Sequence, residues 1–392
     1  MSDRAFLLLL AAVITLGSIA TNIYIPALPA VRADFDAGVA EVQATFAVAL
    51  ITFAIGILVW GPISDRYGRR PAIISGMAIV VTGSTICLTA QSLGWLVLGR
   101  AVQAFGTAVG IAVSRAIVSD KFPADRMAPL LAKLAIVSVT ANGLAPILGG
   151  FLTAGFGWRS VFAALLVAAA IGTWFIWRYL PETRSTDKVP PNAREMAHVA
   201  GQLVRKRLFM SCVLQTAAAY AVFLVFISLA PYVMISALHR PQTEFGLYYL
   251  FIALGYVLGN WCVGRFAGRG QHWMVVTGGT IQAAGAVAAL LFVTAGLTHP
   301  IWIFGPIGVL FFGQGLFMPN MTAIAVSLAP QHAGVGSSTL GFLQQVIGAI
   351  CVQSMAVYAT DTALPLVLFC ACASLLQLAV LWLSPRIEAR AR

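Results

Sequence analysis

Residues 61–70 read GPISDRYGRR, a short basic segment that joins two long apolar runs at residues 42–62 and 72–91. An apolar run of about 20 residues is long enough to cross the hydrocarbon core of a membrane. Lys and Arg concentrate in the short cytoplasmic loops that connect such runs. This stretch therefore predicts a membrane protein, with residues 61–70 forming a cytoplasmic loop between two spans.

The composition of the whole chain favours the same class. Hydrophobic residues make up 60% and charged residues 9% of the 392 positions, whereas soluble domains carry about 25% charged residues. A net charge of +11 would suggest a nucleic-acid partner in a soluble protein, but here the basic residues lie in short loops between apolar runs. No nucleic-acid partner is therefore expected. All six cysteines lie in apolar runs without metal-ligand spacing to His, so no metal or cofactor is expected either.

Twelve apolar spans result when the chain is divided at Pro, Gly and charge clusters. They cover residues 5–25, 42–62, 72–91, 94–117, 129–154, 158–180, 209–235, 244–264, 273–295, 300–324, 336–358 and 363–384. With a cytoplasmic N-terminus, the outer loops receive only Arg32, Arg159 and Arg240. The positive-inside rule therefore places both termini in the cytoplasm and predicts an all-α membrane protein of twelve transmembrane helices.

One long polar segment, residues 181–208, divides the chain into an N-terminal half (1–180) and a C-terminal half (209–392) of six spans each. Asn192 precedes Glu195 by three residues, a spacing typical of a helix start. An apolar face flanked by basic residues follows, formed by Met196, Val199, Leu203 and Val204. We expect an interfacial amphipathic helix that joins two bundles. The alternative is a flexible linker.

A faint internal repeat accompanies this division. Residues 264–269 read GRFAGR and repeat part of the segment at 61–70 about half a chain later. Two parallel six-helix bundles related by pseudo-symmetry, with a site between them near the middle of the membrane, are one plan of secondary transporters.

The spacing Gly61-x-x-x-Asp65-Arg66-x-Gly68-Arg69-Arg70 resembles the loop signature of the major facilitator superfamily. We expect Gly61 to let helices approach closely and Asp65 to cap or face the N-terminus of a neighbouring helix. Positive-inside charge explains the arginines but not the spacing of Gly and Asp. The resemblance implies a gating role for Gly61, Asp65, Arg66, Gly68, Arg69, Arg70, Pro146, Gly149 and Gly150.

Further motifs agree with this family. The spacing Arg100-x-x-Gln103-x-x-Gly106 is similar to its fourth-span signature, residues 145–150 (APILGG) resemble the fifth-span motif of its drug antiporter branch, and residues 180–183 (LPET) resemble the usual end of span six. Residues 22–29 (NIYIPALP) and 333–338 (AGVGSS) resemble the bicyclomycin and chloramphenicol resistance subfamily. The resemblance covers nearly the whole chain. It implies a twelve-span drug:proton antiporter of the bacterial inner membrane.

Two positions depart from the family pattern. Ala145 replaces a usual Gly, which still permits close packing. Asn22 stands where the subfamily usually has the Asp that takes up and releases a proton. Asn has nearly the shape of a protonated Asp but does not titrate. The sequence leaves open whether Asn22 is a natural variant with different coupling or a substitution that fixes the neutral state.

Arg100 is the only charged residue deep inside a span, and the only Asp or Glu within the twelve spans is Glu244, at the first position of span 244–264. An ionisable group inside the membrane indicates a functional site, so one interpretation is a polar anchor that senses position 22 and meets substrate or water. The other is a structural arginine that ties the fourth span to the first. Asn22, Tyr24 and Gln103 are the expected neighbours in a cavity for substrate and proton.

Other cavity candidates lie in the C-terminal half. Tyr220 and Phe223 share a helix face that Phe226 extends, which suits an adaptable apolar pocket, although packing against lipid or neighbouring helices explains each one as well. Uncharged polar residues inside spans normally face the interior of a bundle. Among them we expect Asn320, Gln344 and Gln345 to reach the cavity.

The expected function is multidrug efflux by alternating access, with a small neutral or amphipathic drug-like substrate and proton antiport implied by the resemblance. The alternative is a proton-independent uniporter or metabolite exporter of the same fold, which Asn22 favours. An enzyme is not expected, because all five His lie in loops without a catalytic cluster. A channel would need a more continuous polar lining. The lipid bilayer is the expected surrounding, and a monomer the expected unit.

Overall fold

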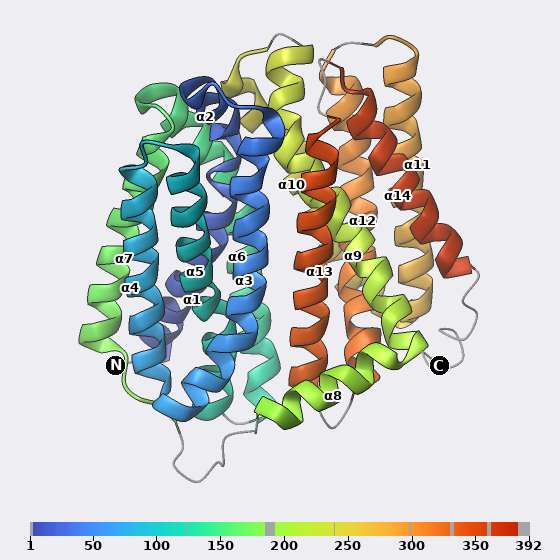
Figure 1. Cartoon of the computed structure of the whole chain (residues 1–392). Helices are drawn as coiled ribbons and strands as arrows, with labels where there is room; N and C mark the ends of the chain where they lie inside the picture. Colours follow the sequence, from blue (N-terminus) through green and yellow to red (C-terminus); the bar gives the residue numbers. More distant parts are fainter. Residues whose placement is uncertain are drawn as a thin grey trace. The chain divides into compact units, whose positions relative to one another are not determined.

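The computed structural model describes residues 3–122, 124–184, 193–238, 240–297, 299–329, 333–358 and 362–382, and nearly all of them are helical (Figure 1). Eleven helices in this part of the chain are long and apolar enough to cross a membrane. A further long helix, α6 (Ala124–Phe156), has a shorter described apolar stretch at Gly143–Phe156. The chain is a multi-pass membrane protein. The described residues form two compact units, Met1–Glu195 and Met196–Arg392.

The N-terminal unit is an antiparallel helix bundle whose helices pack through small residues. A side chain on Gly83 of α4 would collide with the backbone of Gln103 on α5, and a Cβ on Gly106 would lie 2.6 Å from the carbonyl oxygen of Gly76. Small residues permit this close approach where lipid gives no hydrophobic drive for association. The elements are α1 (Asp3–Asn22), the 3-10 turn η1 (Ile25–Ala27), α2 (Leu28–Phe35), α3 (Val39–Tyr67), α4 (Arg69–Leu88), α5 (Leu93–Lys121), α6 and α7 (Arg159–Tyr179).

Helix α8 (Ala193–Arg205) follows, so the predicted amphipathic helix is present over these residues. Its Leu203 is 3% exposed and packs in an apolar cluster of the C-terminal unit with Phe209 and Phe317, while Val199 lies against the same cluster. Val204, predicted to share the apolar face, is exposed.

The C-terminal unit is a second helix bundle in which buried amides link neighbouring helices. Gln314 on α12 donates to the carbonyl of Ala219 on α9 at 2.9 Å, and Gln282 on α11 donates to Gln377 on α14 at 3.1 Å. Such bonds satisfy polar groups that lipid cannot. The elements are α9 (Arg207–Tyr232), the π-helical turn η2 (Val233–Ala237), α10 (Gln242–Arg265), the 3-10 turn η3 (Ala267–Arg269), α11 (Gln271–Thr294), α12 (Ile301–Ser327), α13 (Ala333–Ala356) and α14 (Leu364–Trp382).

Candidate functional site

The first transmembrane segment is broken at the candidate coupling position. Helix α1 ends at Asn22, which is buried, and the chain continues through η1 into α2. Helix α1 thus ends three residues before the predicted end of the first span (5–25), and the apolar helical stretch continues through η1 and α2 to Phe35. Pro26 lacks an N–H, and its ring would clash with the carbonyl of the residue four positions earlier, which is Asn22. The proline thus ends the helix at the residue that the sequence marked for coupling.

Arg100 closes the end of this broken helix. It lies about two turns into α5 and is 1% exposed. Its Nη1 donates to the carbonyl oxygen of Ala20 at 3.1 Å and to Oε1 of Gln103 at 2.6 Å. Ala20 belongs to the last four residues of α1, whose carbonyls have no partner inside the helix. The cation therefore lies at the negative end of the α1 dipole, where positive charge is stabilised.

Two aromatic and hydroxyl contacts complete this cluster. The guanidinium of Arg100 lies 4.8 Å from the centre of the Tyr24 ring, and the Tyr24 hydroxyl is 3.0 Å from Oγ1 of Thr45 on α3. Gln103 donates through Nε2 to Oγ of Ser84 on α4 at 2.8 Å. The polar cluster, defined as Tyr24, Arg100 and Gln103, thus connects the break in α1, where Asn22 is buried, with α3, α4 and α5. Nε and Nη2 of Arg100 make no hydrogen bond with the described residues.

Helix α6 lies directly against the break through its fifth-span motif. A side chain on Gly149 would collide with the carbonyl oxygen of Ile23, the residue after Asn22. Pro146 is buried on the same helix. Gly150 faces open space, so an added Cβ there would meet no atom within 4 Å. Of the two motif glycines, Gly149 is the one that the contact requires.

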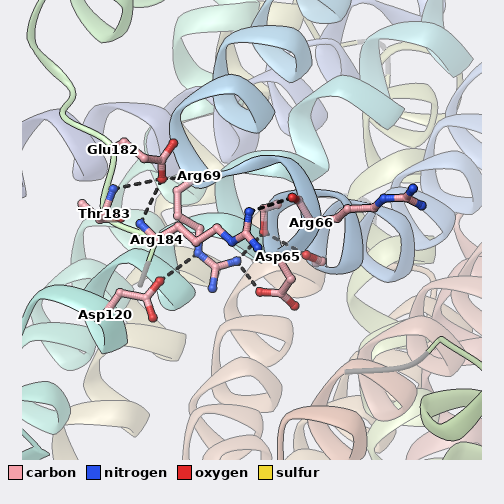
Figure 2. A network of polar contacts seen from close by, with 9 residues as sticks. Asp65, Arg66, Arg69, Asp120, Glu182, Thr183 and Arg184 are labelled. Carbon is pink, nitrogen blue, oxygen red and sulfur yellow. Dashed lines mark hydrogen bonds and ion pairs between the residues drawn. The ribbon is translucent and has the colours of Figure 1, made fainter. Parts of the chain in front are cut away.

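The turn between α3 and α4 forms a second polar network, drawn in Figure 2. Arg69 donates through Nε to Asp120 at 2.9 Å, through Nη1 to Ser64 at 2.7 Å, and through Nη1 to Asp65 as well. Asp120 is at the end of α5 and Asp65 at the end of α3. One guanidinium therefore holds the ends of two helices at the start of α4.

Glu182, which follows α7, caps the N-terminus of α4. Its carboxylate accepts from the backbone N–H groups of Arg69 at 2.9 Å and Arg70 at 3.1 Å (Figure 2). Gly68 makes this possible, because its φ of 106° is in a region that favours glycine and a Cβ there would lie 2.6 Å from Oε2 of Glu182. Arg184 donates to the carbonyl of Arg66 at 2.8 Å and closes the network.

The pKa of Glu182 is shifted by this position. Partial burial raises it, but hydrogen bonds from the backbone N–H groups of Arg184, Arg69, Arg70 and Thr183 outweigh burial, so the pKa lies below its ordinary value. The carboxylate is therefore held in the charged form that caps the helix.

The close helix contact expected at Gly61 is not seen among the described residues, and Asp65 faces the start of α4 through the side chain of Arg69. Gly61 makes no close helix contact, because an added Cβ would meet no atom within 4 Å. The acidic cap of α4 is Glu182, whereas Asp65 bonds to the side chain of Arg69. Arg70 donates through Nη2 to the carbonyl of Trp177 at 2.6 Å, and the backbone carbonyl of Arg66 accepts from the side chain of Arg184.

The repeat in the C-terminal unit keeps the backbone of this turn but not its charges. Gly270 precedes α11 with a φ of 84°, as Gly68 precedes α4. At the same offset, Ala267 and Gln271 stand in the places of Asp65 and Arg69. Arg269 instead lies over two rings, 5.3 Å from the centre of Phe266 and 4.8 Å from the centre of Trp273.

The candidates of the C-terminal unit separate into two environments. Tyr220 and Phe223 are partly buried with ring centres 6.0 Å apart, and the side chain of Gln345 on α13 interacts with Tyr220. Gln344, its neighbour, is partly buried too. We name Tyr220, Phe223 and Gln345 the aromatic-amide cluster.

Phe226 and Asn320 lie elsewhere, inside the bundle. Phe226 is fully buried against Phe304 and Phe311, with ring centres 5.5 and 6.3 Å away. Asn320 is buried and donates to the carbonyl of Leu316 at 2.8 Å and to the sulfur of Met274 at 3.6 Å. Both contribute to packing in this structure.

Several residues that hold these clusters were not among the sequence candidates: Ser64, Asp120, Glu182, Thr45 and Ser84. Glu182 lies within the LPET segment that the sequence singled out, so that motif was its signal. Asp120 ends a long apolar run beside Lys121 and carries no signal of its own.

Comparison with known proteins gives the context for these clusters. Residues 10–352 match the family model described as Major Facilitator Superfamily. The chain is 29% identical over 351 residues to Multidrug resistance protein D of Escherichia coli (87% of this chain, 85% of the relative) and 25% identical over 369 residues to the Bicyclomycin resistance protein homolog of Haemophilus influenzae (93% and 92%).

Solved structures share the fold. A bacterial homologue of the human lysosomal transporter Spinster superposes with a TM-score of 0.77 at 17% identity, covering 100% of this chain and 99% of that one. The crystal structure of a D-xylose-proton symporter gives 0.77 at 14% identity, covering 97% and 98%. The predicted fold class, an all-α membrane protein of the twelve-span type, is confirmed.

Proposed function

The chain belongs to the major facilitator superfamily, and on this premise we propose that it is a secondary active transporter that exports small neutral or amphipathic compounds, antibiotics among them, by alternating access. The family is one of transporters and not of enzymes. The relatives named as multidrug and bicyclomycin resistance proteins support this substrate class at 29% and 25% identity. The observation that carries the proposal is the polar cluster, which places a buried cation beside a break in a transmembrane helix.

The chemistry of the polar cluster favours a neutral or electron-rich substrate. Two nitrogens of Arg100, Nε and Nη2, carry N–H groups that no described residue accepts, so a substrate carbonyl or hydroxyl can accept from them. A cationic substrate would be repelled, because like charges at about 4 Å repel by several kcal/mol at protein interior screening. The aromatic-amide cluster offers ring faces for the apolar part of the substrate and an amide for its polar part.

Proton coupling depends on position 22. The resemblance places a titrating Asp there, and proton antiport is the coupling that the family pattern supports. Asn22 lies at the end of α1, one turn or less from the carbonyl that Arg100 binds. In this chain the position is fixed in the neutral state. The second candidate function, proton-independent export or uniport, is favoured by this residue.

The turn network around Arg69 and the contact between Gly149 and Ile23 supply the proposed gating elements. The arginines at residues 66–70 and the basic residues of the other loops support a cytoplasmic location for this turn and for both termini. The proposed setting is the bacterial inner membrane, with a single chain as the transport unit.

Transport into liposomes tests the function. The purified chain and its Asn22→Asp variant are reconstituted, and uptake of radiolabelled chloramphenicol is followed with and without a pH gradient. We expect gradient-independent counterflow in the parent chain and gradient-driven uptake in Asn22→Asp. Absence of uptake in both variants, while each keeps its thermal stability, contradicts the proposed substrate class. Gradient-driven uptake by the parent chain contradicts the role assigned to position 22.

A further inference from the structure

An apolar groove of about 1020 Å³ lies on the N-terminal unit, away from the residues of the polar cluster. Its walls come from α1 between Leu8 and Ile19, from α7 between Ala168 and Tyr179, and from Met77 of α4. Leu8 is 71% exposed at its rim. The groove is therefore open along the side of transmembrane helices and accessible to the hydrocarbon of the bilayer.

The length of the groove matches one leaflet. Eleven residues separate Leu8 from Ile19, and as many separate Ala168 from Tyr179, which at 1.5 Å per residue gives about 16 Å along either helix. Half of a hydrocarbon core of about 30 Å is about 15 Å. A groove of this length accommodates the acyl chains of a single lipid from one side of the membrane.

One end of the groove has the features of a membrane interface. The last turns of α7 carry Trp174, Phe175 and Tyr179, with Phe175 stacked on Tyr179 at 6.0 Å between ring centres. Trp and Tyr gather at the level of the lipid headgroups. Tyr179, which lines the groove, therefore marks its headgroup end.

This same end carries two arginines. The guanidinium of Arg178 lies 5.3 Å from the centre of the Tyr179 ring and is exposed. Arg70 reaches the carbonyl of Trp177 at 2.6 Å. The nearby acidic groups are engaged: Glu182 with backbone N–H groups, and Asp65 and Asp120 with Arg69. A negatively charged headgroup would meet two arginines there.

We infer that this groove is a binding site for one anionic phospholipid, whose acyl chains lie between α1 and α7 and whose phosphate lies at Arg178 and Arg70. Apolar contact alone does not distinguish a bound lipid from bulk lipid, because both environments are hydrocarbon. The groove fits the acyl chains by its shape, and the two arginines favour a negatively charged headgroup. Near a membrane surface, each basic residue raises the affinity for an anionic lipid about fivefold. A neutral drug has no negatively charged group that could interact with Arg178 and Arg70.

Native mass spectrometry of the full chain, delipidated in detergent, tests this inference. The protein is titrated with phosphatidylglycerol or with phosphatidylcholine of the same acyl chains. We expect one phosphatidylglycerol to bind before all others and with at least fivefold preference over phosphatidylcholine. Ala168→Leu and Gly172→Leu fill the groove and should abolish this first binding step, whereas Ala170→Leu, on the same helix but outside the groove, should leave it unchanged.

Charge variants separate headgroup recognition from shape. Arg178→Gln should lower the phosphatidylglycerol preference about fivefold, while Arg178→Lys should retain most of it. Arg205→Gln, which removes a charge on α8, serves as the control for general electrostatic attraction. Equal binding of both lipids, or loss of preference in Arg205→Gln as large as in Arg178→Gln, would overturn the inference. So would displacement of the first phosphatidylglycerol by chloramphenicol, which would make the groove a drug site.

Discussion

Replacing Gly68 with Ala should destabilise the N-terminal unit through two separable effects. The backbone at φ 106° and ψ 156° lies in a region that only glycine adopts readily, and the strain for another residue is about 1–3 kcal/mol. The new Cβ would also lie 2.6 Å from Oε2 of Glu182. Moving this carboxylate removes the cap of α4, which typically contributes about 1 kcal/mol.

Together these effects predict a loss of about 3 kcal/mol, which for a unit of this size lowers the melting temperature by about 6–12 °C. Thermal unfolding of the purified protein in detergent, followed by tryptophan fluorescence, measures this shift. Gly61→Ala is the matched control, because Gly61 belongs to the same segment but faces open space within α3. Ala there should be neutral or stabilising by up to about 1 kcal/mol.

The double variant Gly68→Ala with Glu182→Ala separates strain from collision. If the Cβ displaces the carboxylate, the second change adds less destabilisation in the Gly68→Ala background than in the parent chain. The reasoning is refuted if Gly68→Ala and Gly61→Ala melt at the same temperature.

Three further outcomes are expected. Gly149→Ala should destabilise the protein by about 1–3 kcal/mol and impair transport, because the new Cβ collides with the carbonyl oxygen of Ile23. In the control Gly150→Ala the new Cβ meets no atom within 4 Å, so this variant should melt and transport as the parent protein does. Equal effects of the two substitutions would contradict the contact between Gly149 and Ile23. The folded pKa of Glu182 is below the ordinary 4.5, so the stability that its carboxylate contributes is present above pH 4.5 and is lost as the pH falls through the folded pKa. When the melting temperature is plotted against pH, Glu182→Gln should therefore approach the parent protein only in acid. A constant difference in melting temperature at every pH would argue against the lowered pKa. Arg100→Lys keeps the charge but loses the planar guanidinium, so liposome uptake per folded protein should fall about tenfold, and the melting temperature should fall as well because the buried bonds to Ala20 and Gln103 are weakened. Unimpaired uptake would show that the guanidinium geometry is dispensable.

The sequence was informative where apolar length and special residues decide the structure. Spans follow from uninterrupted apolar runs, and Gly68 was singled out as a position of the loop motif between the second and third spans. Helix α8 was predictable because polar and apolar positions alternate with helical period outside the membrane. Arg100 stood out because a buried cation is rare enough to be conspicuous.

Partners across the bundle could not be predicted in the same way. Asp120 and Glu182 meet Arg69 from far along the chain, and nothing near them in sequence specifies that meeting. Within a span, lipid-facing and core-facing positions are both apolar, so periodicity does not show which face Phe226 presents. The end of the first helix lies at Asn22 and not at the predicted residue 25, because Pro26 disrupts the helix one turn before its own position.

The turns before α4 and α11 both contain a glycine with positive φ, Gly68 and Gly270, but they differ in the side chains that stabilise them. Protons can neutralise carboxylates, whereas the rings beneath Arg269 do not titrate. Acid therefore acts on the carboxylate contacts of the turn at Gly68, whereas the contacts of Arg269 with its two rings carry no carboxylate. A brief exposure to a pH below 4.5 thus offers a way to weaken the cap of α4 without touching the ring contacts of Arg269.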